Sequence, residues 1–497
     1  MMRILHAIHD FLPRHAAGSE IYAFNLCGEL AKRHSVHVLA AEYDPARAHG
    51  TLTWRVHEGL PVIEIVNNWE GSFADTWRSP RLGAQLDHVL RATQPDVLHV
   101  HSLLNLSFEL PALARARGIR VAATLHDHSL ACPAGGQRLY LQERTVCDEI
   151  QPVRCASCFS KSPYHTQMAV GGLSRAAGRG GQWVGRTARW AARQAPGVAA
   201  LFTRRVLDRT QPVTEVEIGA RLDQLRSVFD AVQLFVAPSV SVADAHARLG
   251  LHRSKLLVSD YGFVHRSLRP PRGANPEHAQ LTDAGRGAGR SPVPGEHYRA
   301  TRAEGPIAIP RSPVRIGFVG TLVWHKGVHV LLEAARSLPA DRYELEIWGS
   351  LETFPDYAMQ LKVLAQDLPV RFCGGFDNGD AASVYERFDV LVVPSLWPEN
   401  SPLVIHEAFM AGIPVVAART GGIPELVTDG VNGVLYDAPS SAALANALRA
   451  LLDEPERIIQ MADRVPFVKT IEEDVQEWER RYETLMQGDL DSPAGQG

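Results

Sequence analysis

Residues 389–427 read DVLVVPSLWPENSPLVIHEAFMAGIPVVAARTGGIPELV. The run Asp389–Val393 is short, apolar and followed by Pro-Ser, which predicts a buried strand. Val404–Met410 is an apolar helical segment, and Ile413–Ala417 is a second strand. A strand, a helix and a strand in this order form a βαβ unit with parallel strands. The stretch therefore assigns the chain to the α/β class.

The same alternation extends in both directions from this unit. Further strands are predicted at 3–8, 36–41, 62–66, 96–100, 121–125, 234–237, 255–259, 315–319, 343–348 and 370–373. Helices are predicted at 20–33, 81–92, 325–337 and 472–486, together with one that Ser239 begins. A single core rarely grows past about 250–300 residues. A chain of 497 residues therefore predicts two domains, both Rossmann-like.

The segment 266–313 differs in kind from its surroundings. It is poor in large apolar residues and dense in Gly, Pro and Arg, so it cannot bury enough surface to offset its ordering entropy. We interpret it as a flexible linker or insertion. The other boundaries are an N-terminal domain at 1–265 with a Cys-rich loop at 131–160, a C-terminal domain at 314–470, and a terminal helix with a disordered tail at 471–497.

Composition excludes several classes of protein. The chain is 45% hydrophobic and 21% charged with a formal net charge of -4, and it carries no motif for binding nucleic acid. No apolar run approaches the roughly 18 residues of a membrane-spanning helix. His6, His9 and Asp10 interrupt the short apolar N-terminus, unlike a signal peptide. We expect a cytoplasmic protein, at most peripheral to the inner face of a membrane.

The sequence GTLVWHKG at 320–327 directly follows a predicted strand. Gly320 permits close approach of backbone to a phosphate, and the next helix offers its N-terminal amides to an anion. Lys326 adds a full positive charge on a flexible stem. The alternative is a solvated lysine in a tight strand-to-helix turn.

A second motif, PENSPLVIHE at 398–407, follows the strand Asp389–Val393. Ligands of open α/β sheets bind beyond the carboxyl ends of strands, where Glu399 falls. Glu407 lies about one turn inside the next helix, and its carboxylate can accept the two hydroxyls of a ribose. The alternative is an acid favoured by the helix dipole, with Glu399 as a surface residue.

A third motif, ARTGGIPELV at 418–427, again follows a strand and contains the flexible pair Gly421-Gly422. In this order and spacing, the three motifs resemble the retaining glycosyltransferases of family 4, also called glycosyl transferases group 1. The resemblance is strong over 314–465 and weaker over 3–130 and 233–262. It implies the GT-B fold, in which two Rossmann-like domains face each other across a cleft.

The resemblance also implies an activity and its residues. The donor is an NDP-sugar, Lys326 neutralises its diphosphate, Glu407 holds the ribose, and Glu399 acts near the reacting carbon. The reaction retains the configuration of the sugar and needs no cofactor or metal, because the leaving diphosphate helps to accept the acceptor's proton. The other implied donor contacts are Gly320, Thr321, Asn400, Ser401, Pro402, Leu403 and, from the N-terminal domain, Gly18.

One position departs from the family pattern. Thr321 stands where the family often has Arg, which removes a cation from the diphosphate site. Either Lys326 carries more of the charge or an arginine such as Arg419 substitutes for it.

The N-terminal domain is expected to bind the acceptor. Gly18 keeps one glycine of a loop that usually reads G-G-x-E, here at 17–20. His126 follows the strand 121–125, where the family has a histidine that contacts the transferred sugar, and it is the second catalytic candidate. Asp127 is expected to orient His126, and His101 is a weaker candidate. A structural histidine at a strand end is the alternative.

Four cysteines gather in the loop at 131–160: Cys132, Cys147, Cys155 and Cys158, ending in C-x2-C. In a cytoplasmic chain such a set suggests a tetrahedral structural zinc site, with unligated thiols or a redox pair as alternatives. Cys27 and Cys373 fit core positions in a helix and a strand.

The stretch 174–209 is rich in Arg and holds Trp183 and Trp190. It suits either a solvated helix or contact with anionic lipid. The acceptor is open: a polysaccharide, a lipid-linked sugar or a small molecule.

Two other functions remain. An NDP-sugar epimerase or hydrolase on the same fold would need a further acid–base pair. A non-catalytic nucleotide-sugar-binding protein would not need Lys326, Glu399, Glu407 and His126 together. A nicotinamide dehydrogenase is disfavoured because no G-x-G-x-x-G follows the first strand.

Overall fold

The computed structural model describes residues 1–178, 212–265, 313–376 and 378–488, with five single positions between 181 and 210. The chain forms two compact units, Met1–Phe263 with Thr470–Gly497, and Val264–Lys469. The predicted linker, apart from residue 313, and the tail beyond 488 lie outside the described residues, as does most of the Arg- and Trp-rich stretch. Among the described residues, no helix is both long and apolar enough to cross a membrane.

The first unit is built on a parallel sheet. Its strands are β1 (Arg3–Ile8), β2 (Ser35–Glu42), β3 (Leu52–His57), β4 (Leu60–Val66), β5 (Val97–Val100), β6 (Arg120–Thr124), β9 (Leu234–Ala237) and β10 (Leu256–Val258). Within the described part, their order is β10-β9-β6-β5-β1-β2-β4-β3. All neighbours are parallel except β3 and β4, which are antiparallel. The central strands are buried on both faces, as parallel sheets between helices are.

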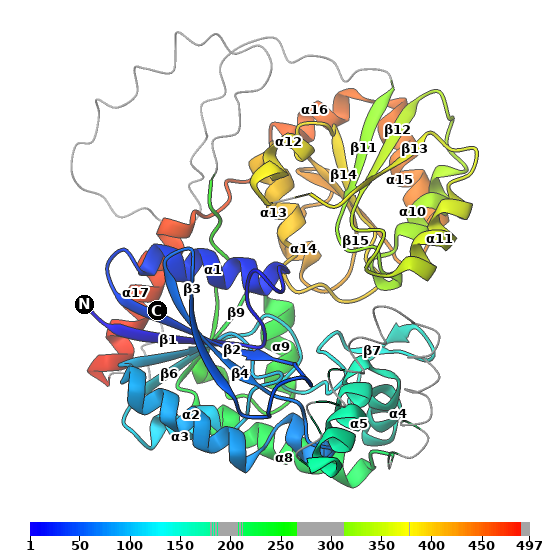
Figure 1. The fold of residues 1–497 in the computed structure, drawn as a ribbon. Helices are drawn as coiled ribbons and strands as arrows, with labels where there is room; N and C mark the ends of the chain where they lie inside the picture. Colours follow the sequence, from blue (N-terminus) through cyan, green and yellow to red (C-terminus); the bar gives the residue numbers. More distant parts are fainter. Residues whose placement is uncertain are drawn as a thin grey trace, which may run out of the picture. The chain divides into compact units, whose positions relative to one another are not determined.

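Helices cover both faces of this sheet. Figure 1 shows α1 (Gly18–Leu30) and α17 (Ile471–Gln487) on one face, and α2 (Pro80–Thr93), α3 (Leu110–Arg115) and α8 (Glu215–Ala231) on the other. The C-terminal helix α17 therefore belongs to the first unit and packs beside α1. The predicted helix behind Ser239 is α9 (Val240–Arg248), and the Ser239 hydroxyl accepts from the Val242 amide as its N-cap. The 3-10 turns are η1 (Phe73–Thr76) and η3 (Arg253–Lys255).

The Cys-rich segment is more regular than a loop. It contains the hairpin β7 (Leu139–Tyr140) and β8 (Thr145–Val146), then α4 (Pro152–Lys161) and α5 (Pro163–Ala176). These elements lie together at one end of the first unit (Figure 1). Phe159 of α4 stacks edge-on against Phe73 at 4.9 Å and joins the main core. Gly171 of α5 has no room for a side chain, because a Cβ would meet the Asn68 carbonyl oxygen at 1.9 Å.

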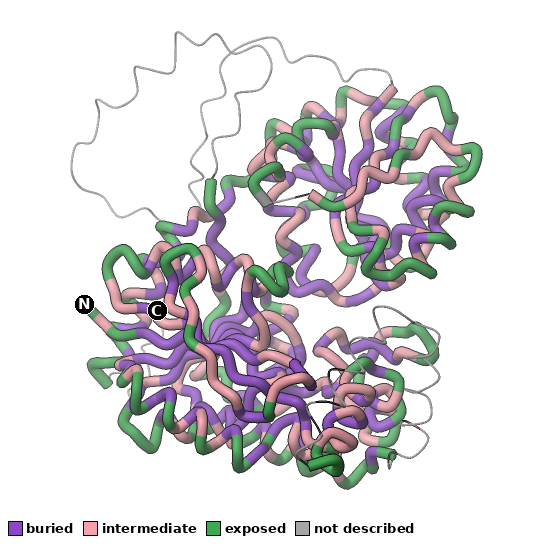
Figure 2. Tube along the Cα trace, viewed as in Figure 1, coloured by how far each residue is buried: buried purple, intermediate pink, exposed green. Residues whose placement is uncertain are grey.

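The second unit is a smaller version of the same architecture. Its parallel sheet has the order β13-β12-β11-β14-β15-β16 within the described residues. The strands are β11 (Val314–Val319), β12 (Tyr343–Trp348), β13 (Val370–Gly374), β14 (Val390–Val393), β15 (Val415–Ala418) and β16 (Gly433–Tyr436). Figure 2 shows both sheets buried and the outer surfaces of the helices exposed. Each unit is thus a Rossmann-like α/β domain.

The helices of the second unit also form two layers. Figure 1 shows α10 (Val328–Ala335), α11 (Pro355–Leu364) and α15 (Ser441–Asp453) on one face, with α12 (Ala381–Tyr385) and α13 (Leu403–Met410) on the other. The short elements are η5 (Trp324–Lys326), η6 (Asn378–Asp380), α14 (Ile423–Leu426) and α16 (Glu456–Ala462).

The predicted helix 325–337 is wrong at its start. The chain forms the 3-10 turn η5, and the helix α10 begins only at Val328. Gly327 between them has φ of 74°, a left-handed conformation that interrupts an α-helix. This break separates Lys326 from the helix.

Candidate functional site

In the second unit, two loops meet where the strand order reverses. β11 lies between β12 and β14, so the chain runs outward from β11 on one side and from β14 on the other. The loops 320–327 and 394–402 leave the carboxyl ends of these two strands. Ligands of open α/β sheets bind at such a point. Gly320 ends β11 with φ of 152°, and its amide donates to the Trp348 carbonyl.

An ion pair joins the two loops. Lys326 Nζ lies 2.7 Å from Glu399 Oε1, with the lysine side chain 28% exposed and the glutamate 5%. The Ser395 hydroxyl donates to the same oxygen at 2.6 Å. Lys326 Nζ also lies 5.3 Å from the centre of the Trp397 ring, within range of a cation–π contact. The predicted diphosphate-binding cation and the predicted catalytic carboxylate are therefore direct neighbours.

Glycines allow the loops to approach this closely. A Cβ on Gly327 would lie 1.8 Å from the Pro394 carbonyl oxygen. A Cβ on Gly421, which has φ of 56°, would lie 2.1 Å from the Glu399 carbonyl oxygen. The Gly422 amide donates to that same oxygen at 2.7 Å. The pair of glycines after β15 thus holds the backbone of Glu399 in place.

Glu407 is a half-buried carboxylate in α13. Its Oε2 accepts a hydrogen bond of 2.6 Å from the Tyr385 hydroxyl of α12. Burial raises the pKa of Glu407, and the bond from Tyr385 opposes this. Burial and the nearby Glu407 charge raise the pKa of Tyr385. The surroundings thus disfavour the charged form of Glu407, which is a mark of functional rather than structural acids.

The start of α13 carries the remaining predicted contacts of this unit. Asn400 and Ser401 are buried ahead of Pro402, the N-cap, and Leu403, the first helical residue. The Ser401 hydroxyl lies 2.9 Å from His406 Nε2. The buried loop thus presents backbone at a helix N-terminus, where an anion is favoured.

Thr321 and Arg419, the two positions that bear on the missing family arginine, have different surroundings. Thr321 is exposed in the loop after β11. Arg419 pairs with Asp429 and Asp437, both at 3.3 Å. In this structure Arg419 therefore serves the loop after β15, and Lys326 is the cation of the 320–327 loop.

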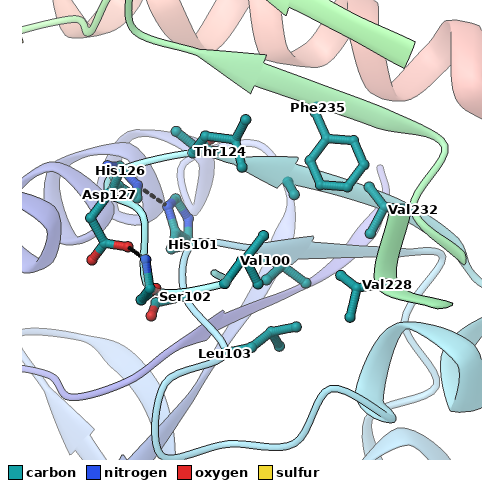
Figure 3. Close-up of a pocket in the computed structure, with 14 residues that line it drawn as sticks. Val100, His101, Ser102, Leu103, Thr124, His126, Asp127, Val228, Val232 and Phe235 are labelled. Atoms are coloured by element: carbon teal, nitrogen blue, oxygen red, sulfur yellow. Dashed lines mark hydrogen bonds between the residues drawn. The ribbon is translucent and has the colours of Figure 1, made fainter. Parts of the chain in front are cut away.

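In the first unit, His126 occupies the corresponding edge. Its Nδ1 lies 2.9 Å from the Tyr261 hydroxyl and its Nε2 lies 2.9 Å from His101 Nδ1. Figure 3 shows His126 and His101 beside each other at the ends of neighbouring strands. The Asp127 carboxylate instead accepts from the Ser129 amide at 2.7 Å. The ring is thus held by Tyr261 and His101, which the sequence did not predict.

The cavity beside His126 is too small for a sugar. It measures about 20 Å³ and is lined mainly by apolar side chains of β5, β6, α8 and β9 (Figure 3). That volume suits about one water molecule. It therefore belongs to the packing beneath His126 and is not an acceptor pocket.

The C-terminal helix α17 contacts the residues that pack against His126. Tyr22 of α1 packs against Tyr261, with the ring centres 4.6 Å apart, and edge-on against His126, with the ring centres 5.4 Å apart. The Tyr22 hydroxyl donates to Asp474 Oδ2 at 2.8 Å and accepts from Trp478 Nε1 at 3.1 Å. Two residues of α17 therefore fix Tyr22, the aromatic ring that packs on His126.

Gly18 begins α1 and is exposed, and it lies two residues before Glu20, the buried centre of an ionic cluster. Glu20 Oε1 lies 3.0 Å from His9 Nε2 and 3.3 Å from His15 Nδ1. Its other oxygen accepts from the Ala17 amide at 3.2 Å. Burial acts to raise the pKa of Glu20, but its bonds to His15 and His9 outweigh it and lower the pKa. Glu20 thus caps the helix whose first amides flank Gly18.

Two family models match the chain. Residues 301–465 match the family described as Glycosyl transferases group 1, and residues 16–149 match the one described as Glycosyltransferase Family 4. The chain belongs to the group 1 glycosyltransferases. The two matched ranges cover the loops that carry Gly18 and His126 in the first unit, and Lys326, Glu399 and Glu407 in the second.

Curated relatives match this chain over part of their length. A D-inositol 3-phosphate glycosyltransferase of Corynebacterium kroppenstedtii is 33% identical over 199 residues, which are 38% of this chain and 44% of that protein. The one from Corynebacterium urealyticum is 36% identical over 184 residues, 35% of this chain and 43% of that protein. The chain thus spans less than half the length of these relatives.

Solved structures show the same fold. HepE of Anabaena, solved in complex with UDP and glucose, superposes with a TM-score of 0.53 at 16% identity over 99% of each chain. Sucrose-phosphate synthase from Thermosynechococcus elongatus superposes with a TM-score of 0.56, also at 16% identity over 99% of each chain. The chain therefore has the GT-B fold.

Four neighbouring histidines, three of them buried, predict a loss of stability in acid. Burial lowers the pKa of His6 and of His126 to about 3, and it also lowers the pKa of His99 and His101. Between pH 6.5 and 3 the unfolded chain binds more protons at these rings than the native chain, so native stability falls as pH falls. The melting temperature should drop through this window. His101→Gln should flatten the drop, whereas Leu98→Ala on the same strand should lower the melting temperature similarly at every pH.

His9 and His15 act in the opposite direction. The bond to Glu20 raises the pKa of His15, and the Glu20 carboxylate raises that of His9 against the effect of burial. Their contribution is present below pH 6.5 and is lost above it. Because this contribution is constant below pH 6.5, it does not change stability between pH 6.5 and 3, and a melting temperature independent of pH in this window would contradict the assignment of four neutral rings.

Proposed function

We propose that this protein is a retaining glycosyltransferase that moves a sugar from an NDP-sugar to a saccharide, lipid-linked or small-molecule acceptor. The observation that carries the proposal is the pair of Lys326 and Glu399 at the reversal point of the second sheet, with Glu407 on the helix that follows. The relatives named above are inositol 3-phosphate glycosyltransferases, and HepE binds UDP and UDP-glucose. The names of the relatives support glycosyl transfer, and the HepE complexes support a nucleotide-sugar donor.

In the proposed donor site, charge is matched to charge. Lys326 balances the diphosphate, and the amides of Ser401–Leu403 at the start of α13 bind its oxygens. Glu407 accepts the two ribose hydroxyls. Because Lys326 pairs with Glu399 at 2.7 Å, arrival of the diphosphate gives the lysine a second anionic partner and lets Glu399 act on the donor sugar.

Catalysis then consists of positioning and of stabilising the charge that develops on the leaving diphosphate. The acceptor hydroxyl attacks on the face from which the diphosphate departs, and a diphosphate oxygen takes its proton. The configuration at the reacting carbon is therefore retained. Burial lowers the pKa of His126 to about 3, so in the proposed reaction it contacts the transferred sugar as a neutral ring and not as a cation.

A panel of UDP-, GDP-, ADP- and dTDP-sugars tests the proposal by thermal shift. A donor at a hundredfold excess over its Kd should stabilise the protein by about 2.7 kcal/mol. NMR of the product formed with that donor should show the anomeric configuration of the donor. A product of inverted configuration, or free sugar as the only product, would refute the transferase assignment as stated. Failure of every donor to bind would refute it as well.

Glu407→Gln separates donor binding from stability. Because the native pKa of Glu407 is raised, the native state binds more protons than the unfolded state, and the charged carboxylate costs stability as pH rises above about 4.5. The variant should gain stability relative to the wild type between pH 4.5 and 8. Donor affinity should fall about ten- to a hundredfold, since a hydrogen bond to a charged group is lost.

The matched control for this variant is Glu333→Gln on the exposed side of α10. It should change neither donor affinity nor the dependence of stability on pH. Donor affinity that is equal in Glu407→Gln and in the wild type would sink the ribose role of Glu407.

A further inference from the structure

Four cysteines of the first unit converge on one small cavity. The cavity measures about 20 Å³ and is lined by Cys132, Cys147, Cys155 and Cys158 together with Pro133, Ala134, Arg138, Leu139 and Tyr140. The thiols come from three places in the chain: the turn after β6, the end of β8, and α4. A space of this size suits a single water-sized sphere or one metal ion.

The local secondary structure brings these thiols together. The Cys132 amide donates to the His128 carbonyl at 2.7 Å in a turn, and Cys147 directly follows β8. Cys155 and Cys158 are three apart on α4, which puts both on one face of that helix. Cys147 and Cys155 are buried. A hairpin, a helix and a C-x2-C pair thus bring four thiols to the lining of one cavity, and four thiols are the ligand set of a structural zinc site.

Two arginines at the cluster indicate a negative charge there. Arg221 is only 3% exposed and donates to the carbonyls of Ser129, Leu130 and Ala131. The thiols of Cys132 and Cys155 lie close enough to Arg221 for a charge on them to act on its guanidinium. Burial of an unbalanced guanidinium is costly. Neutral thiols do not balance it, whereas thiolates around a metal do.

Arg138 gives the same indication from the other side. It is 8% exposed, it lines the cavity, and its Nε has no hydrogen-bond partner among the described residues. Four thiolates around a divalent ion carry a net charge of about -2, which two guanidinium groups would neutralise. The charge of the surroundings therefore matches a metal centre with four thiolate ligands.

We propose that Cys132, Cys147, Cys155 and Cys158 bind one structural zinc ion. The Cys147 thiol lies 3.1 Å from the Glu149 carbonyl, and the Cys158 thiol lies 3.8 Å from that of Leu139. Zinc binding replaces these weak contacts by four metal–thiolate bonds and releases the thiol protons. Because all four positions are protein ligands, the ion is structural and no open coordination position remains for catalysis.

The zinc ion would fix the loop that follows His126. Between Cys132 and β7, a Cβ on Gly136 would lie 2.8 Å from the Ser129 amide and 3.0 Å from the Asp127 side chain. The segment that the metal ties down is therefore packed on Asp127 and Ser129, one and three residues after His126. This proposal is independent of the transferase reaction, since the metal site stands whether or not a donor binds.

The test is the metal content of the full chain purified without chelator. Elemental analysis should give about one zinc per chain, and the double variant Cys155→Ser with Cys158→Ser should lose it. Cys373→Ser is the matched control, because Cys373 is a partly exposed thiol on β13, outside the cluster, and it should keep the zinc.

A second measurement, made on the wild-type protein, tests the proposal even if the double variant fails to fold. An organomercurial added to the wild type should release zinc in step with modification of four thiols, and cobalt substitution should produce the visible spectrum of a tetrahedral thiolate site. A folded wild type that holds substoichiometric zinc even after incubation with Zn²⁺ would overturn the proposal. Mass spectrometry that finds disulfide bonds among these four cysteines would overturn it as well.

Discussion

Lys326→Ala is expected to lower kcat/KM for the NDP-sugar by about 100- to 1000-fold, the usual cost of removing one group that stabilises developing charge. Lys326 is the cation of the 320–327 loop, since Thr321 carries no charge and Arg419 pairs with aspartates of another loop. Steady-state kinetics with the donor found in the panel measures the effect. Lys362→Ala on the exposed side of α11 is the control and should leave kcat/KM unchanged.

Loss of the lysine also leaves the buried Glu399 carboxylate without its cationic partner. Removing one member of a buried pair destabilises a protein more than removing both. Lys326→Ala should therefore melt at a lower temperature than the double variant Lys326→Ala with Glu399→Gln. Both variants should have a kcat/KM far below that of the wild type. If the double variant recovers activity, or if Lys326→Ala keeps the wild-type kcat/KM, Lys326 does not bind the diphosphate.

Gly327→Ala is expected to destabilise the second unit by more than about 4 kcal/mol, the range reached only by severe packing or backbone defects. Its φ of 74° costs any other residue about 1–2 kcal/mol. Its Cβ would in addition lie 1.8 Å from the Pro394 carbonyl oxygen, which main chain cannot easily vacate. Urea denaturation of the full chain measures the loss.

Gly412→Ala is the control, because Gly327 and Gly412 share a left-handed conformation but differ in the room available for a side chain. Gly412 has φ of 71° and nothing within 4 Å of its Cβ position. It should therefore lose only the conformational part, about 1–2 kcal/mol. Equal losses in the two variants would mean that the turn relaxes away from Pro394, and the rigid placement of Lys326 would be wrong.

The sequence predicted the elements that bury apolar runs. β11, β12 and β14 are short apolar segments followed by Gly or Pro-Ser, and the structure has them within one residue of the predicted bounds. The sequence did not predict β3. This strand lies at the edge of the sheet, and its apolar residues Trp54 and Val56 face solvent, so its hydrophobic pattern does not indicate a buried face. The sequence also missed β16, a four-residue strand at the other sheet's edge. Short edge strands depend on their neighbours more than on their own residues.

The predicted site residues differ in how far local sequence placed them. Gly320, Lys326, Glu399 and Glu407 follow strand ends, and strand ends can be predicted from hydrophobic runs and turn residues. The partners that hold them could not be predicted in this way. Tyr385 binds Glu407 from another helix, and Ser395 binds Glu399. Nothing in the spacing of these partners marks them.

The sequence by itself determined the α/β class, the two parallel sheets and the loops that carry the motifs, because these follow from periodicity and turn chemistry over fewer than about twenty residues. Only the tertiary structure decided which of those loops meet. Lys326 and Glu399 are 73 residues apart, and Tyr22 and Asp474 are 452 apart. Such pairs meet because β11 lies beside β14 and α17 returns to α1, and strand order and helix docking are set by the burial of whole apolar faces.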